Sequence, residues 1–309
     1  MSADGSTKAI LAALFANAGI AAAKFIGAGL TGSSSMLAEG VHSVADTSNQ
    51  GLLLLGKKTS RRSETRQHPF GYGRDRYFYS FIVALLLFSM GSLFALYEGV
   101  HKIMDPHALH GPMIAIVILL VAIALETYSF RTAIVASREL KGNASWWQFI
   151  RQAKVPELPV VLLEDAGALV GLIFALFGVS LTMVTGDPIW DGIGTVMIGV
   201  LLGVIAVVLI IEMKGLLIGE GSSDDELDLI VGELEQNPVQ RVIHIRTQYI
   251  GPEELLVAAK LALTRGMSLP EIAGAIDDAE DRIRAKVPAA RLIYLEPDLD
   301  RTPDATASR

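Results

Sequence analysis

The stretch IWDGIGTVMIGVLLGVIAVVLII, residues 189–211, contains one acidic residue and is otherwise almost entirely apolar. About twenty apolar residues are needed for a helix to cross the hydrocarbon core of a bilayer, so this stretch predicts a membrane span. Upstream stretches of similar length bring the number of predicted spans to six: residues 8–30, 35–55, 77–100, 112–135, 158–184 and 189–211. We therefore expect an α-helical membrane protein with six transmembrane helices.

The second of these stretches, residues 35–55, is the least apolar, because it contains Glu39, His42 and Asp46. Its flanks favour a span. The turn-forming serines at 33–35 precede it, and a basic cluster follows it: Lys57, Lys58, Arg61 and Arg62.

Composition changes near residue 220. Before this point the chain is a series of apolar stretches, and after it the chain is polar and acidic. We assign residues 8–219 to a transmembrane transport domain and 220–298 to a cytoplasmic dimerisation domain. The polar ends, 1–7 and 299–309, are expected to be disordered, and residues 8–30 are interpreted as a retained span, because no basic region with a cleavage site precedes them.

Lysine and arginine are concentrated between spans 2 and 3 and between spans 4 and 5, while the loops on the other side contain Lys102 as their one basic residue. The positive-inside rule then places both termini in the cytoplasm, with the protein in the cell inner membrane. The net charge of −7 argues against a nucleic-acid partner. The chain has no cysteine, so a transition-metal site must be built from histidine and carboxylates.

The C-terminal part predicts the element order αββαβ, typical of a small ferredoxin-like α+β domain. The predicted elements are a helix at 224–235, strands at 242–250 and 255–263, a helix at 268–285 and a strand at 291–295. Ser268 followed by Glu271 is a capping-box pattern for the second helix.

Ionisable residues inside predicted spans point to a binding site, because charge is costly at that depth. His42 and Asp46 are spaced i, i+4 and share one helix face, with Glu39 on the same side. Span 5 adds the consecutive pair Glu164 and Asp165. One imidazole and several carboxylates match the ligands of a tetrahedral metal site. For Glu39, and for Glu126 in span 4, the alternative is a hydrogen bond between helices.

On these features the chain resembles the cation diffusion facilitator family, whose members export zinc, manganese or iron. The resemblance covers nearly the whole chain. It rests on residues 35–46, on the loop motif HPFGYGR at 68–74, and on Asp165 and Asp191.

The resemblance implies a transport site with two ligands from span 2 and two from span 5. His42, Asp46 and Asp165 match this pattern, but Val161 stands where the fourth ligand is expected. Glu164 is the first substitute and Glu39 the second. A site rich in oxygen ligands would accept Mn²⁺ or Fe²⁺ more readily than a site with two histidines.

Other family sites are incomplete in this chain. His68 matches a loop ligand, but Tyr72 stands where a second histidine is common. Lys260, Tyr294 and Glu296 stand where the family's cytoplasmic zinc ligands would fall, so we expect no metal site in that domain.

The resemblance also implies a homodimer in the lipid bilayer. We therefore expect an exporter of divalent cations, with no permanently bound cofactor and no enzymatic activity. Zn²⁺ is the expected substrate, with Mn²⁺, Fe²⁺ and Co²⁺ as further candidates, and protons are the expected counter-substrate. The alternative is a membrane metal or pH sensor that does not transport.

Overall fold

The computed structural model describes residues 18–299. The segments 1–7 and 299–309 were predicted to be disordered; the first of them, all of the second except residue 299, and the first ten residues of predicted span 1 lie outside the described residues. The chain divides into two compact units. One comprises residues up to 59 together with 75–214, and the other comprises 60–74 together with 215 onward.

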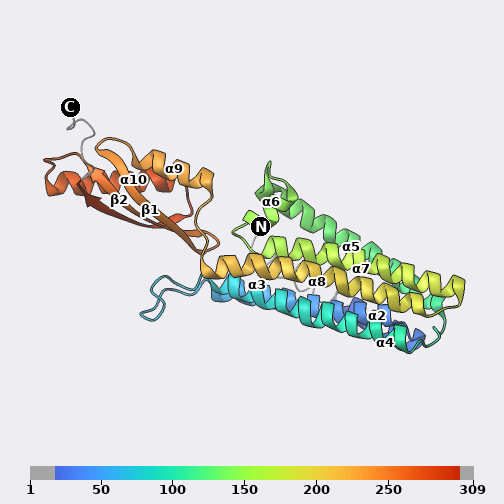
Figure 1. Ribbon diagram of the computed structural model, residues 1–309. Coiled ribbons are helices and arrows are strands. Elements are labelled where there is room, and N and C mark those ends of the chain that lie inside the picture. Colours follow the sequence, from blue (N-terminus) through green and yellow to red (C-terminus); the bar gives the residue numbers. More distant parts are fainter. Residues whose placement is uncertain (1–17, 300–309) are drawn as a thin grey trace. The chain divides into compact units, whose positions relative to one another are not determined.

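The first unit is helical, and its long helices run alongside one another (Figure 1). It opens with a helix at Ala18–Thr31. The elements that follow are α2 (Ser34–Thr59), α3 (Asp75–Leu86), a π-helical segment (Leu87–Leu93), α4 (Phe94–Met104), α5 (Pro112–Lys141), α6 (Trp146–Gln152), α7 (Glu157–Thr185) and α8 (Ile189–Ile218).

Four helical segments of this unit are long and apolar enough to cross a membrane: Asp75–Met104, Pro112–Arg138, Glu157–Thr185 and Ile189–Ile218. They correspond to predicted spans 3 to 6. The helix Ala18–Thr31 is apolar but shorter in its described part, and α2 carries several charged residues. The first two spans therefore stay predictions.

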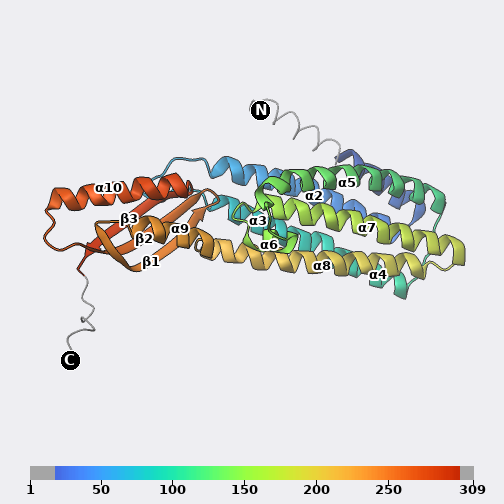
Figure 2. The ribbon, with the colours of Figure 1, turned by 90° about the horizontal axis from the view of Figure 1, so that it is seen from above.

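Glycines bring α8 close to its neighbours. A side-chain carbon added at Gly194 would lie 2.8 Å from the carbonyl oxygen of Phe174, and one added at Gly178 would lie 2.8 Å from that of Trp190. Only glycine allows two helix backbones to approach this closely. The contact holds α7 and α8 side by side, as two views show (Figures 1 and 2).

Asp191 at the start of α8 fixes the start of α2. Its carboxylate accepts hydrogen bonds from the backbone N–H of Ser34 at 2.8 Å and from the hydroxyl groups of Ser33 at 2.8 Å and Ser34 at 3.1 Å. A carboxylate at a helix N-terminus satisfies backbone donors that have no partner in the helix. Asp191, which the family resemblance had singled out, thus caps another helix from a distance in sequence.

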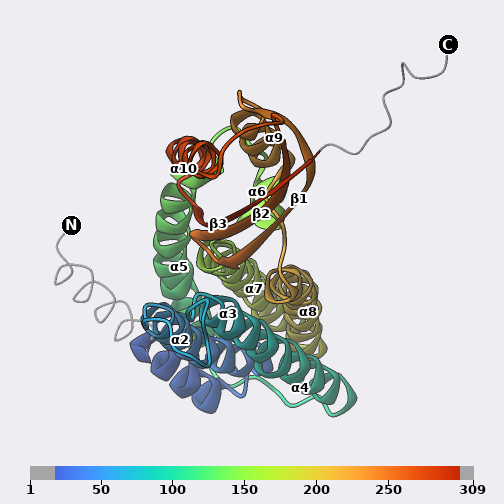
Figure 3. The same cartoon turned by 90° about the vertical axis from the view of Figure 1, so that its left-hand side faces the viewer.

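The second unit contains α9 (Asp224–Leu234), β1 (Val239–Gly251), β2 (Glu254–Leu263), α10 (Leu269–Lys286) and β3 (Ala290–Asp298), in the predicted order. The strand order is β1-β2-β3, with β1 antiparallel and β3 parallel to β2. Both helices cover one face of the sheet (Figure 3), and side chains such as Ile230, Ile283 and Val257 form the core. The capping box of α10 is present, with the Glu271 carboxylate accepting the Ser268 N–H at 2.7 Å.

Candidate metal-transport site

One face of α2 buries five polar side chains: Glu39, His42, Ser43, Asp46 and Asn49. His42 is fully buried, and its Nδ1 lies 3.6 Å from Oδ1 of Asp46. Both ring nitrogens of His42 and this Asp46 oxygen lack a hydrogen-bond partner within the described residues. Buried polar atoms are rarely left unpaired, because that costs free energy, so these atoms point to a ligand.

Glu164 on α7 faces this surface of α2. Its Oε1 accepts a hydrogen bond from the Asn49 side-chain amide at 2.6 Å, and the carboxyl groups of Glu164 and Asp46 lie within hydrogen-bonding reach of each other. Two carboxyl groups this close in a buried place need a proton or a metal cation between them. The structure thus brings together Asp46 and Glu164 from two different helices.

Asp165 points elsewhere. Its Oδ2 accepts a hydrogen bond from the hydroxyl of Ser129 on α5 at 2.9 Å. Consecutive residues of a helix point about 100° apart, so one of the acidic pair reaches α2 while the other reaches α5.

Lys24, in the helix Ala18–Thr31, is a charged residue that the sequence reasoning missed. It is fully buried, and its Nζ donates to Oε2 of Glu39 at 3.0 Å and to Oγ of Ser43 at 2.8 Å. A lysine inside an apolar stretch was the sequence feature that could have revealed it, because an ammonium group at that depth needs a partner. Glu39 thus has a cationic partner before any metal arrives.

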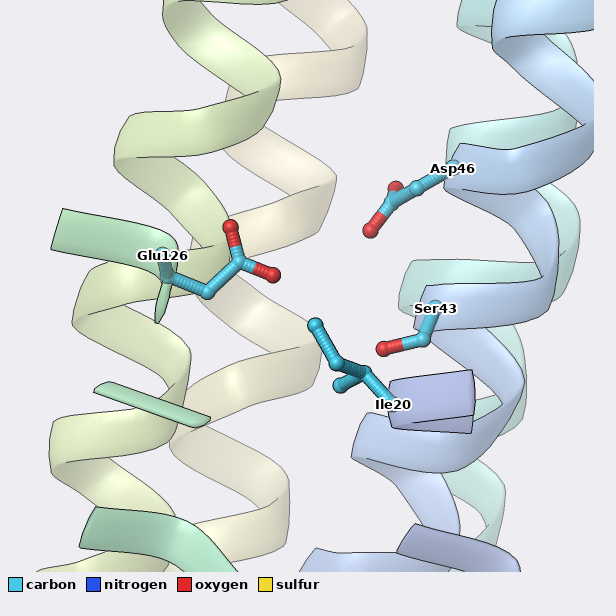
Figure 4. A pocket seen from close by; sticks show the side chains of 4 residues that line it. All are labelled: Ile20, Ser43, Asp46 and Glu126. Carbon is cyan, nitrogen blue, oxygen red and sulfur yellow. The ribbon is translucent and has the colours of Figure 1, made fainter. Parts of the chain in front are cut away.

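A pocket opens beside these groups, lined by Ile20, Ser43, Asp46 and Glu126. Asp46 extends into it from α2, and Glu126 extends toward it from α5 (Figure 4). Glu126 therefore lies at the site, although the sequence left its role open.

The π-helical segment passes close to His42. A side-chain carbon added at Gly91 would lie 3.8 Å from Nδ1 of His42. π-helical turns are rare and often occur at functional sites. This one places a residue without a side chain next to the imidazole.

No group of three or more His, Asp or Glu side chains within residues 18–299 is gathered closely enough to hold a metal ion. The predicted ligands lie on two helices, His42 and Asp46 on α2 and Glu164 and Asp165 on α7, but the structure does not close them into one coordination shell. The predicted loop residue His68 lies in the other unit, where it is exposed and packs against Tyr72 with ring centroids 4.6 Å apart.

In the sheet of the second unit, Lys260 of β2 stands opposite His244 of β1 and Glu296 of β3. Its Nζ lies 2.8 Å from Glu296 and 3.4 Å from Asp298. These hydrogen bonds raise the pKa of Lys260, because both carboxylates favour the charged ammonium. A lysine thus supplies the positive charge between two acidic side chains.

Long apolar helices with a buried cluster of histidine and carboxylates define a membrane protein built to handle a cation. The cation efflux transmembrane domain family matches residues 10–218, about two thirds of the chain. The chain belongs to the cation diffusion facilitator family, as the sequence motifs predicted.

Three relatives illustrate the range of this family. The human mitochondrial protein named proton-coupled zinc antiporter SLC30A9 is 33% identical over 78% of this chain and 43% of its own length. Metal tolerance protein C4 of Arabidopsis thaliana is 32% identical over 83% of this chain and 57% of its own length. The magnetosome protein MamB of Magnetospira sp. is 25% identical over 92% of each chain. The chain thus spans less than half the length of the human relative.

Proposed function

We propose that this protein exports a divalent transition-metal ion, Zn²⁺ in the first place, in exchange for protons. The observation that carries the proposal is the set of unpartnered buried atoms on His42 and Asp46, with the Glu164 carboxyl group beside them. The relatives support a cation as the substrate, and the name of the human protein supports zinc and protons in particular.

In this proposal His42, Asp46 and Glu164 bind the metal, Asp165 joins them when the shell closes, and Glu39 stays with Lys24. Metal binding requires a neutral imidazole and ionised carboxylates, so protons and the metal compete for the same atoms. Access alternates between the two sides of the membrane around this site. The replacement of the metal by protons at these atoms would couple metal export to proton entry.

The topology belongs to the same proposal. Six spans, with both termini and the sheet domain in the cytoplasm, follow from the basic loops and the positive-inside rule. A homodimer in the cell inner membrane follows from the family.

The test is metal flux in proteoliposomes, measured for Zn²⁺, Mn²⁺, Fe²⁺ and Co²⁺ separately, with and without a pH gradient. We expect zinc flux that a proton gradient accelerates and that Asp46→Ala abolishes, while the variant still folds. Metal binding without flux would indicate a sensor instead. Normal flux in a folded Asp46→Ala variant would contradict the proposed site.

A further inference from the structure

The pocket between α2 and α5 contains a carboxylate outside the ligand pairs of spans 2 and 5. Glu126 is half-buried, and its carboxyl group and that of Asp46 extend toward the same space from opposite walls (Figure 4). Ser43 and Ile20 complete the lining.

An acidic cluster alone is weak evidence for a site, but Asp46 adds a second observation. Asp46 is 8% exposed, and its Oδ1 has no hydrogen-bond partner in the described part of the chain. Asp46 lines the pocket, and a buried carboxylate oxygen without a donor lacks the partner that a cation would provide.

The ionisable groups around the pocket are mostly acidic. Lys24 of the first described helix, Asp165 of α7 and Glu39 of α2 lie near enough to Glu126 to act on it electrostatically. Glu164, Glu126 and Lys24 act in the same way on Asp46. Lys24 is already engaged by Glu39 at 3.0 Å, so its charge is offset within that pair. Asp46 and Glu126 are left facing one another across the pocket, and a cation between them would relieve their repulsion.

We propose that Glu126 is a further metal-binding residue, which holds the transported divalent cation together with Asp46 between α5 and α2. The inference rests on the proposed function and extends its ligand set to a third helix. It also explains how the site is completed although Val161 cannot bind a metal. An additional carboxylate makes the site richer in oxygen, which favours harder ions such as Mn²⁺ relative to a site with a second histidine.

The test compares four purified full-length proteins in detergent: wild type, Glu126→Gln, Glu126→Asp and Glu98→Gln. Glu98 lies on α4, is half-buried like Glu126, and is outside the pocket lining, so it controls for loss of a membrane carboxylate. Zn²⁺ and Mn²⁺ affinities are measured by titration calorimetry, and the visible spectrum of bound Co²⁺ reports the coordination geometry.

We expect Glu126→Gln to weaken Zn²⁺ and Mn²⁺ binding about ten-fold or more, since even residues that only orient ligands have effects of this size. Glu126→Asp keeps the charge but withdraws the carboxylate by one methylene, so it should also weaken binding and change the Co²⁺ spectrum. Glu98→Gln should match the wild type. If Glu126→Gln fails to fold, the metal affinity and Co²⁺ spectrum of Glu126→Asp decide the test.

Wild-type affinity and an unchanged Co²⁺ spectrum in both Glu126 variants would overturn the inference. It would also be overturned if the glutamine variant alone lost affinity, because Glu126 would then act through its charge without touching the metal. A wild-type protein that binds none of these metals would overturn the proposed function itself, so the two failures are distinguishable.

Discussion

The Lys24 ammonium lies 3.0 Å from Oε2 of Glu39, and both side chains are completely buried. The other oxygen of Glu39 faces α7, where a side-chain carbon added at Gly171 would approach it to 2.6 Å. Glu39 is thus clamped between an ammonium group and a helix backbone. This arrangement gives the buried Glu39 carboxyl group a hydrogen-bonded cationic partner on a neighbouring helix.

We expect the effects of Lys24 and Glu39 substitutions on the stability of the protein to be strongly coupled. Lys24→Met should lower the stability of the protein by about 3–5 kcal/mol, because it leaves a buried carboxylate without its counter-charge. The double variant Lys24→Met/Glu39→Gln should recover much of that loss. Thermal unfolding in detergent measures both effects, and simple addition of the two single effects would show that the pair is not coupled.

Asp191 should be a structural residue without direct contact to the metal. Asp191→Ala removes four hydrogen bonds to a carboxylate at the start of α2, and it should lower the stability of the protein by at least about 2 kcal/mol. Asp191→Asn should lower the stability of the protein by less than Asp191→Ala does. The control is Asp105→Ala, whose side chain is 70% exposed and should change stability by no more than about 0.5 kcal/mol. An unfolding temperature of Asp191→Ala equal to that of the control would refute the capping role.

Glu164 should act directly on the metal. Glu164→Gln is expected to weaken metal binding about ten-fold or more and to alter its pH dependence. Asn49→Ala removes only the amide that orients Glu164 and should have a smaller effect on affinity. Calorimetric titration at two pH values makes the comparison. Unchanged affinity and pH dependence in Glu164→Gln would mean that the residue has a structural role and that Glu39 or water completes the shell.

Lys260 should prevent metal binding at the three-stranded sheet of the C-terminal domain. The register aligns His244, Lys260 and Glu296 on three adjacent strands. Lys260→His should therefore create Zn²⁺ binding at least about ten-fold tighter than in a Lys260→Gln control, because histidine and carboxylates are zinc ligands. The measurement uses the full chain with Asp46→Ala, which removes a ligand of the proposed membrane site. Equal zinc binding in both variants would argue against a site at this place.

Glu271 should make the stability of the C-terminal domain sensitive to acid. The backbone and hydroxyl hydrogen bonds from Ser268 hold the pKa of Glu271 below its ordinary value of 4.5. Its contribution to stability is therefore fully present above pH 4.5 and is lost as the pH falls through the lowered value. Glu271→Ala should reduce the unfolding temperature of this domain at pH 7, and the difference from the wild type should shrink in acid.

The control for this prediction is Asp277→Ala, which removes an exposed acid of the same helix. A constant difference between Glu271→Ala and the wild type at all pH values would contradict the role of the carboxylate.

Local patterns in the sequence were enough to predict much of the fold. The start of α10 followed from Ser268 and Glu271, because a helix cap depends on residues only three positions apart. The strands of the C-terminal domain were predicted within a few residues, and their observed ends extend further, as at Val239 for β1. Four of the six predicted spans correspond to long apolar helices in the structure.

The site was only partly predictable. The spacing of His42 and Asp46 places them on one face of a helix, and the structure agrees. Which member of the pair Glu164 and Asp165 faces α2 depends on the rotation of α7, and packing against its neighbours determines that rotation. Glu126 becomes part of the site for the same reason.

The sequence by itself determined the family, the apolar helices and the residue types available for a cation. Only the tertiary structure decided the partners: Lys24 with Glu39, Asp191 with the start of α2, and Asn49 with Glu164. The sequence spacing of residues in a helix shows which side chains share a face, because the helical repeat follows from backbone geometry. The partners of that face belong to helices distant in sequence, because burial in a membrane requires charged groups to find each other across the bundle.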